Sequence, residues 1–177
     1  MTQGQKEYGG ALYDLAAEEK CEDEVQQSLL AALDVLDGAP AYEKLLANPA
    51  LALDTRLGLL DEAFRGGVHP YVLNFLKILC ERSALGALRG CAAQYRARLY
   101  EARGILPVTA ESAVALSEAQ KTSLKEKLQK LTGKTVLLET AVDASLLGGV
   151  RLRYDGKELD GSAAGRLSAL RNALTRV

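Results

Sequence analysis

The stretch HPYVLNFLKILC, residues 69–80, decides the fold of this chain, because its apolar residues cover nearly every face of a helix. His69-Pro70 is typical of a helix start, since proline in the first turn lacks only an N–H that would be unpaired there anyway. A helix that is apolar all round must be surrounded by other helices or by a partner. The stretch therefore predicts a helix packed within a bundle or against another protein.

Amphipathic helices are predicted on both sides of this stretch, because apolar residues recur there three and four positions apart. The predicted stripes are Tyr8, Ala11, Leu12, Leu15 and Ala16; Val25, Leu29, Leu33 and Leu36; Leu53, Leu57, Leu60 and Phe64; and Leu85, Leu88, Ala92, Tyr95, Leu99 and Ala102. A shorter helix is expected over residues 42–47, and it ends at Asn48-Pro49 because proline disfavours the α conformation in the preceding residue. We therefore expect five long helices and one short one.

The pattern changes after Gly104, where short alternating runs appear between helical segments. The net charge changes as well, from −4 over residues 1–104 to +3 over residues 105–177. We therefore predict a mostly α fold with two domains. An N-terminal six-helix bundle is expected over residues 1–104, followed by a small C-terminal α+β domain over residues 105–177.

Strands are predicted in the second domain over residues 105–110, 134–142, 150–154 and 157–159. Asp155-Gly156 is a hairpin signal between the last two of these strands. Pro107 predicts an edge position for the first strand, since proline cannot donate a hydrogen bond to a neighbouring strand. In the third strand Val150, Leu152 and Tyr154 are expected on one face, opposite Arg151 and Arg153.

Two helices are predicted in the same domain. Ser117 and Gln120 stand three residues apart, which predicts a capping box at the start of a helix that Gly133 ends. Ser162 can cap a last helix. The apolar face of that last helix would consist of Leu167, Leu170 and Leu174.

The composition excludes several classes of protein. The chain has 177 residues, with 22 Lys+Arg against 23 Asp+Glu and 48% apolar residues, which is typical of a folded chain rather than of a disordered tail or a basic nucleic-acid arm. No uninterrupted apolar run approaches the roughly 20 residues that cross a bilayer. The N-terminal residues resemble neither a secretory signal nor a transit peptide. We therefore expect a cytoplasmic protein without direct membrane insertion.

Residues that bind metals or catalyse reactions are sparse. Cys21, Cys80 and Cys91 are odd in number and lack a C-x-x-C spacing, so we expect buried free thiols. His69 is the only histidine, which excludes a site with several histidines, and its place before proline predicts a capping or solvent-facing role. The sequence therefore predicts no catalytic residue, no cofactor and no metal.

Gly133-Lys134-Thr135 resembles the end of a phosphate-binding loop but lacks the context of one. That loop needs a glycine where this chain has Leu128, and it follows a strand and opens a helix, the reverse of the order predicted here. We therefore interpret Gly133 as a helix C-cap. Gly148-Gly149 is interpreted as a tight turn or as a close approach of two backbones.

A row of lysines runs along the helix that precedes Gly133, without interleaved aromatic residues. These are Lys121, Lys125, Lys127 and Lys130. The row predicts a solvated or acid-facing surface rather than a nucleic-acid site. A strongly apolar helix in a bundle, joined to a small basic domain, is more typical of an adapter than of an enzyme.

Several segments together carry a resemblance that spans nearly the whole chain. They are Tyr8-Gly9-Gly10-Ala11-Leu12-Tyr13, Asn48-Pro49, Asn74-Phe75-Leu76 with Glu81-Arg82, and Val142-Asp143-Ala144-Ser145-Leu146-Leu147-Gly148-Gly149-Val150 with Leu159-Asp160-Gly161-Ser162 and Arg166-Leu167. In this order they resemble the delta subunit of bacterial F-type ATP synthase, the counterpart of the mitochondrial oligomycin-sensitivity-conferring protein. Ser83-Ala84 and Ala163-Ala164-Gly165 depart from the family pattern.

The resemblance implies a non-catalytic stator subunit, which links the catalytic head of the ATP synthase to the peripheral stalk and resists the torque of the rotor. In that family the N-terminal helix of an alpha subunit docks against the first and fifth helices. The matching residues here are Tyr8, Ala11, Leu12, Leu15, Asn74, Phe75, Ile78 and Leu79. Apolar helix packing suits such a link, because it supplies slow dissociation and needs no bond chemistry.

The resemblance also implies that the C-terminal domain meets the b-type helices of the stalk. The matching residues are Gly148, Gly149, Val150, Arg166, Leu167 and Leu170. The implied location is the cytoplasmic face of the bacterial cell membrane, as a peripheral part of the ATP synthase. The alternative is a stand-alone cytoplasmic helical adapter or regulatory protein with a similar bundle.

Overall fold

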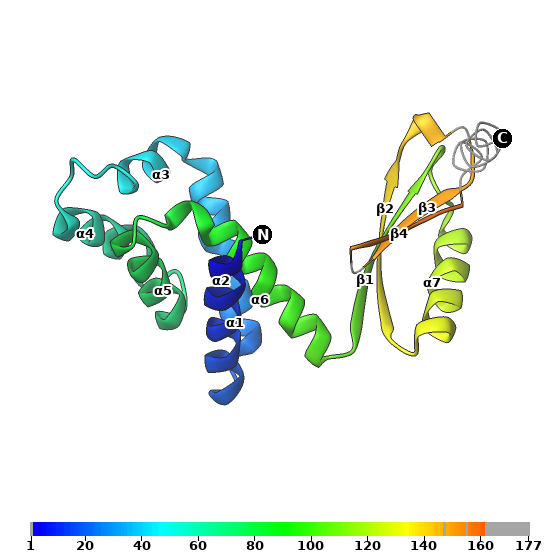
Figure 1. The fold of residues 1–177 in the computed structure, drawn as a ribbon, viewed down its shortest axis with the longest axis horizontal. Helices are drawn as coiled ribbons and strands as arrows, with labels where there is room; N and C mark the ends of the chain where they lie inside the picture. The colour runs from blue at the N-terminus through cyan, green and yellow to red at the C-terminus, as the bar shows by residue number, and fades with distance from the viewer. Residues whose placement is uncertain (1, 147, 155, 162–177) are drawn as a thin grey trace, which may run out of the picture. The chain divides into compact units, whose positions relative to one another are not determined.

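The computed structural model describes residues 2–146, 148–154 and 156–161. The chain divides into two compact units, Met1–Leu99 and Tyr100–Val177, which are described separately below. The fold is mostly helical, with a small mixed four-stranded sheet in the second unit (Figure 1). The predicted domain boundary after Gly104 stays a prediction.

The first unit contains helices where the sequence predicts them. They are α1 (Gln3–Glu18), α2 (Glu22–Gly38), α3 (Pro40–Leu46), α4 (Leu53–Phe64), α5 (Pro70–Glu81) and α6 (Leu88–Ala102), with a short 3-10 turn η1 (Leu85–Ala87) before α6. The end of α6, from Tyr100 onward, belongs to the second unit. As expected, Asn48-Pro49 lies in the loop after the short helix α3.

Local sequence fixes the start of α5. Nδ1 of His69 accepts a hydrogen bond from the N–H of Tyr71 at 3.3 Å, and Pro70 occupies the first helical position. The main-chain N–H of His69 donates to Oγ of Ser28 on α2 at 2.9 Å. These contacts confirm the predicted capping role of His69 and connect the start of α5 to α2.

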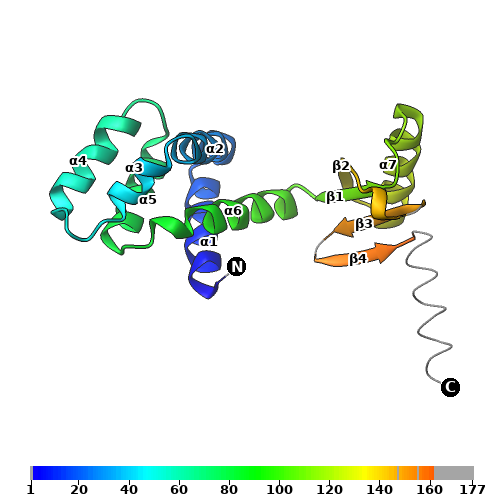
Figure 2. The ribbon, with the colours of Figure 1, turned by 90° about the horizontal axis from the view of Figure 1, so that it is seen from above.

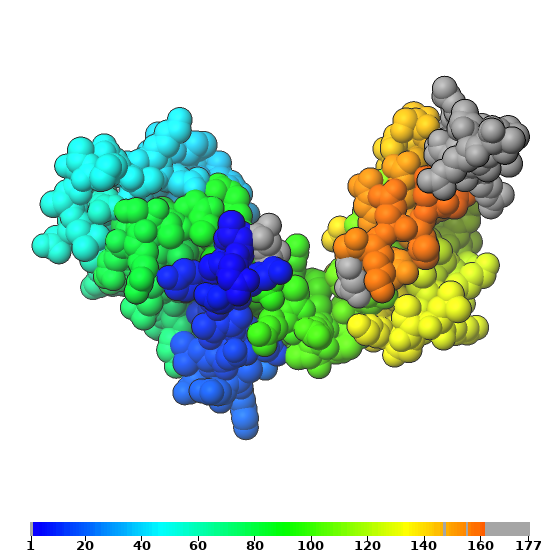
Figure 3. Space-filling model, viewed as in Figure 1, coloured from blue at the N-terminus to red at the C-terminus, as the bar shows by residue number. Residues whose placement is uncertain are grey.

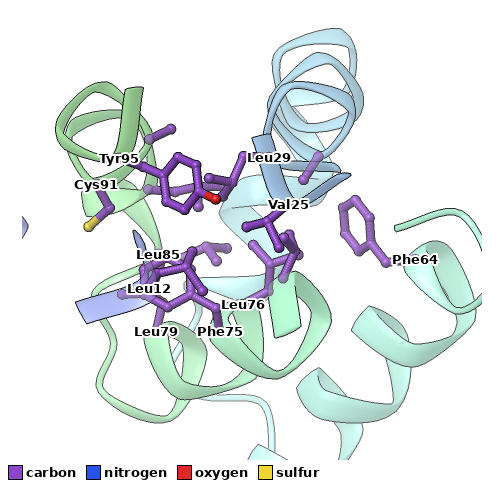
Figure 4. Close-up of a cluster of buried hydrophobic side chains, with 14 of the residues drawn as sticks. Leu12, Val25, Leu29, Phe64, Phe75, Leu76, Leu79, Leu85, Cys91 and Tyr95 are labelled. Carbon is purple, nitrogen blue, oxygen red and sulfur yellow. The ribbon is translucent and has the colours of Figure 1, made fainter. Parts of the chain in front are cut away.

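One apolar core joins the helices of the first unit (Figure 4). Its largest fully buried side chains include Tyr95, Phe64, Leu29, Leu36, Leu46, Leu60, Leu76 and Leu79. The hydroxyl of Tyr95 donates to the carbonyl of Glu22 at 2.9 Å, so the polar end of this buried side chain is paired. Burial of each large aliphatic side chain contributes about 1.5–3 kcal/mol, so this core supplies much of the stability of the unit.

The second unit contains one sheet, in the strand order β2-β1-β3-β4. Its elements are β1 (Ile105–Ser112), α7 (Glu118–Thr132), β2 (Thr135–Val142), the 3-10 turn η2 (Ala144–Leu146), β3 (Val150–Tyr154) and β4 (Lys157–Asp160). Strands β1 and β2 are parallel, whereas β1 with β3 and β3 with β4 are antiparallel. The parallel pair requires a crossover, and α7 provides it.

Helix α7 covers one face of this sheet (Figure 2). Its buried Leu128 packs with Leu106, Val108 and Val136 of the sheet. The predicted capping box is confirmed, because the N–H of Gln120 donates to Oγ of Ser117 at 3.3 Å and the N–H of Ser117 to Oε1 of Gln120 at 2.9 Å. Gly133 ends the helix in the left-handed conformation, with a φ of 68°, as predicted for a C-cap.

The predicted alternation of β3 is confirmed for Leu152 and Tyr154, opposite Arg151 and Arg153. Leu152 and Tyr154 pack against the core on the side of α7. On the other face, Arg153 forms ion pairs with Glu111 at 2.7 Å and with Glu158 at 3.0 Å. Arg151 pairs with the same Glu111 at 3.5 Å. Strands β3 and β4, in orange in Figure 3, form part of the surface of this unit.

The edge position that Pro107 predicts for the first strand is wrong, because β1 lies between β2 and β3. Proline is tolerated there because pairing with β3 is incomplete. Among the described residues, β3 pairs with β1 only from Thr109 onward, so Pro107 faces a neighbouring strand only on the β2 side. The position is therefore locally an edge within a central strand.

Part of the predicted C-terminal structure lies outside the described residues. This applies to the helix expected after Ser162, with Leu167, Leu170 and Leu174, and to Asp155 of the hairpin turn. Gly156, the other residue of that turn, has a φ of 70°, and β3 and β4 pair on either side of it as predicted.

None of the described helices is both long enough and apolar enough to span a bilayer.

Candidate functional site

A mostly apolar groove of about 200 Å³ lies between α1 and α5. It is lined by Tyr8, Ala11, Leu12, Leu15, Tyr71, Asn74, Phe75 and Ile78. Seven of the eight residues proposed from sequence for alpha-subunit binding are in this set, and Leu79 is the exception. The structure thus brings together residues that stand more than fifty positions apart in the chain.

Helical periodicity explains why these residues line one groove. Each helix contributes residues at i, i+3, i+4 and i+7, starting from Tyr8 on α1 and from Tyr71 on α5. Residues with this spacing lie on one face of a helix. The groove is therefore formed by two matching stripes on neighbouring helices.

The groove has a buried floor and a more exposed rim. The floor consists of Leu12 and Phe75, each only 6% exposed. On the rim, Leu15 is 39% exposed, Ile78 is half-buried, and Asn74 is exposed. Ile78 is also absent from the side chains packed against the main core, unlike its neighbour Leu79.

Leu79 belongs to the core instead of the groove. Its side chain is fully buried, and Figure 4 shows it beside Leu12 and Phe75 on the inner side of α5. A residue next to Ile78 along the helix is turned by about 100°, since 3.6 residues make one turn. Direct contact of Leu79 with a partner is therefore not supported by the structure.

Tyr71 lines the groove although the sequence analysis did not assign it there. It precedes Asn74 by three residues and Phe75 by four, so the same stripe that identified those residues could have included it. Burial raises the pKa of its phenol, and the nearby Glu19 and Cys21 raise it further. Tyr71 therefore stays a neutral, amphipathic lining residue.

Close packing against α6 holds the other side of α1. Gly9 and Gly10 are buried, and a Cβ on Gly9 would lie 2.9 Å from Cβ of Gln94 and still closer to the carbonyl oxygen of Cys91. Only glycine allows this approach of the two helices. Arg98 on α6 adds an ion pair with Asp14 at 3.4 Å.

An ion pair connects α5 to α4 outside the groove. Nζ of Lys77 lies 2.7 Å from Oδ1 of Asp61, and Arg65 approaches the same carboxylate at 3.3 Å. The hydrogen bond from Lys77, with the charges of both cations, lowers the pKa of Asp61 despite partial burial. Both walls of the groove are thus fixed by neighbouring helices.

A second hollow, of about 340 Å³, lies beside α2 and has a polar lining. Its residues include Glu24, Gln27, Ser28 and His69, and we call it the α2 hollow. Nε2 of His69 and Oε2 of Glu24 are 3.9 Å apart there. Although it is larger, it offers little apolar surface to a helix and contains no residue proposed from sequence.

The residues proposed for stalk binding are only partly described. Gly148 and Gly149 lie in a bend before β3, and their φ angles of 130° and 81° are conformations that favour glycine. Val150 opens β3 and pairs with Ser112, and its carbonyl accepts a hydrogen bond from the N–H of Gly161 at 3.1 Å. Arg166, Leu167 and Leu170 lie outside the described residues.

The described residues show little that could carry chemistry. No three histidine, cysteine, aspartate or glutamate side chains are grouped there to hold a metal ion. Cys80 and Cys91 are buried free thiols, as predicted, and Cys21 is partly buried. Gly133-Lys134-Thr135 follows a helix and opens a strand, which is the wrong order for a phosphate-binding loop.

Comparisons with known proteins agree on one family. The family model described as "ATP synthase delta (OSCP) subunit" matches residues 5–174. The ATP synthase subunit delta of Solidesulfovibrio magneticus is 36% identical over 174 residues, covering 97% of this chain and 95% of the relative. That of Synechococcus elongatus is 36% identical over 164 residues, covering 92% and 91%.

A solved structure shares the fold. It is a chain of the Toxoplasma gondii mitochondrial ATP synthase hexamer, determined by cryo-electron microscopy. Its TM-score to this structure is 0.76 at 20% sequence identity, with 99% of this chain and 98% of that chain covered. The likeness therefore extends over both units, each with its own fold.

Proposed function

This chain belongs to the ATP synthase delta (OSCP) subunit family, and from that premise we propose that the groove between α1 and α5 binds the N-terminal helix of an alpha subunit. As a member of this family, the chain is a non-catalytic subunit of the peripheral stalk of an F-type ATP synthase. Its role is to act as a stator and not to catalyse a reaction. The alternative of a stand-alone adapter is not favoured by its relatives.

The observation that carries the proposal is the composition of the groove. An amphipathic helix needs an apolar surface long enough for residues spaced at i, i+3, i+4 and i+7. The groove offers two stripes with that spacing, and Leu15 and Ile78 on its rim leave apolar surface in contact with water. Covering such surface supplies the slow dissociation that a stator link needs.

We further propose that the second unit binds the b-type helices of the peripheral stalk. The proposed contacts are Gly148, Gly149, Val150, Arg166, Leu167 and Leu170. Support comes from the family membership and from the exposed turn before β3, where Gly149 is open to solvent. With one partner on each unit, the chain would connect the catalytic head to the stalk.

This arrangement includes three finer proposals. Helices α1–α6 act as one six-helix bundle, residues 1–104 and 105–177 act as separate domains, and the protein lies at the cytoplasmic face of the bacterial membrane as a peripheral part of the complex. The shared apolar core of α1–α6 supports the first of these. The separate core around Leu128 supports the second.

A calorimetric titration of the full chain tests the proposal. One probe is a synthetic peptide with the N-terminal helix of the alpha subunit from the same organism, and the other is the C-terminal segment of its b-type subunit. We expect saturable binding of both, with neither displacing the other, because the proposed sites lie on different units. Failure of the alpha peptide to bind, or its displacement by the b segment, would contradict the proposal.

A further inference from the structure

Asn74 is the polar exception in the groove. Every other lining residue is an aliphatic or aromatic side chain. Asn74 stands in the middle of the α5 stripe, one turn after Tyr71 and one turn before Ile78, and it adjoins Phe75 of the floor. A helix that lies along the groove therefore covers its amide.

The amide of Asn74 makes no contribution to the fold through hydrogen bonds with the described residues. Its side chain forms no hydrogen bond with any of them, whereas Oδ1 of Asn48 accepts one from the N–H of Ala50 at 2.9 Å. Asparagine is also a poorer helix former than leucine or alanine, so local propensity does not favour it in the middle of α5. In the free chain its exposed amide is hydrated.

Docking of a helix changes the surroundings of the Asn74 amide. This amide can donate two hydrogen bonds and accept two, and water molecules are its partners while the groove is open. A polar group that loses water without gaining a partner weakens association, while replacing the water by a matching group costs little. The hydroxyl of Tyr8 is placed differently, because it ends a long side chain that can keep its tip in water.

Given the proposed function, on which this inference rests, we propose that Asn74 is the specificity-determining residue of the groove. Its amide pairs with a hydrogen-bonding side chain in the middle of the alpha-subunit helix. The apolar stripes supply the bulk of the affinity, and Asn74 selects among amphipathic helices. A helix whose buried face is entirely apolar leaves the amide unpaired and is rejected.

The test measures affinities of the full chain for the alpha-subunit peptide by calorimetry, with each polar residue of the peptide replaced in turn by alanine. For Asn74→Leu we expect about 5- to 100-fold weaker binding of the unaltered peptide. One polar position of the peptide should matter to the wild type and not to the variant. Gln27→Leu, which removes an exposed amide from the α2 hollow, should leave the affinity unchanged.

Two results distinguish this inference from the proposal beneath it. If the wild type binds the peptide and Asn74→Leu binds it equally well or better, the specificity role of Asn74 is wrong while the groove stands. If every peptide substitution costs the same in both proteins, the proposed pairing is wrong as well. Absence of binding to the wild type would remove the alpha helix as the partner and both proposals with it.

Discussion

On the side that faces α6, helix α1 presents Gly9 and Gly10, and the two backbones approach so closely that no side chain fits between them. On the side that faces α5, the same helix presents Tyr8, Ala11 and Leu15, and a groove of about 200 Å³ stays open. One helix thus has one closed side and one open side within the same unit.

The difference between the two sides of α1 shows how a small helical unit can keep a docking surface in its binding conformation before a partner arrives. Close packing against α6 fixes the position of α1, so the groove does not depend on α1 and α5 packing tightly on each other. A surface fixed in advance loses little conformational entropy when a partner arrives. The predictions below alter the open side first and the closed side afterwards.

The largest effect is expected for Ile78→Asp on the rim of the groove. Ile78 is half-buried and does not pack against the main core, so the free chain should melt at nearly the same temperature as the wild type. A carboxylate covered by an apolar helix without a partner should weaken binding of the alpha peptide by about 2–4 kcal/mol. Calorimetry and thermal melting on the same sample measure both quantities.

The neighbouring residue Leu79 provides the matched control. Because it is fully buried, Leu79→Ala should destabilise the chain by about 2–5 kcal/mol through the loss of core contacts. A large fall in melting temperature for Ile78→Asp would mean that Ile78 is a core residue like Leu79. Unchanged stability together with unchanged affinity would place the binding site elsewhere.

On the closed side, Gly9→Ala tests the approach of α1 to α6. Helix propensity alone favours alanine over glycine by about 1 kcal/mol, so a stabilising change would be expected from the sequence. An added Cβ would clash with Cys91 and Gln94, so we expect the substitution to lower the free energy of unfolding by about 1–3 kcal/mol instead of raising it. Urea unfolding followed by circular dichroism measures it, and a gain in stability would contradict the close approach.

Gly58→Ala is the counterpart at an open position. Gly58 lies within α4, and a Cβ added there would meet no atom within 4 Å. The substitution should therefore stabilise the chain by about 0.5–1 kcal/mol, because only the helix propensity changes. The same urea experiment applies, and a loss of stability would indicate a contact that the structure does not contain.

The smallest effect concerns the ion pair that holds α5 to α4. The folded chain lowers the pKa of Asp61 below its ordinary value of 3.8, chiefly through the hydrogen bond from Lys77. The pair therefore stabilises the fold above the unfolded pKa, and this contribution is lost as the pH falls through the folded pKa. In Asp61→Asn, stability should fall less steeply than in the wild type between about pH 5 and pH 2. Identical acid unfolding curves would show that the pair contributes nothing.

The set of groove residues came from the family resemblance, and helical periodicity explains why each part of the set lies on one face of its helix. The stripe from Tyr8 to Leu15 on α1 and the residues Asn74, Phe75 and Ile78 on α5 line one groove in the structure. Leu79 could not be separated from Ile78 by sequence, since a helix that is apolar on most faces does not reveal which face meets the core.

The close packing of α1 on α6 and the order of the strands could not be predicted from local sequence patterns. Glycines have no apolar side chain, so the burial of Gly9 against α6 was not foreseen, although it fixes one wall of the groove. The edge strand that Pro107 predicted is wrong, because the order of strands in a sheet depends on contacts between residues that are distant in the chain. Pairing with β3 begins only at Thr109, which is a tertiary feature rather than a local one.

The most direct test of the account is a nuclear magnetic resonance titration of the labelled full chain with the alpha-subunit peptide. The account predicts that the largest shifts of backbone amide resonances occur along the two stripes, Tyr8 to Leu15 on α1 and Tyr71 to Ile78 on α5. Resonances around the α2 hollow and in the sheet should change little. Shifts centred on that hollow or on the sheet, with the two stripes unaffected, would contradict the claim that the groove is the binding site.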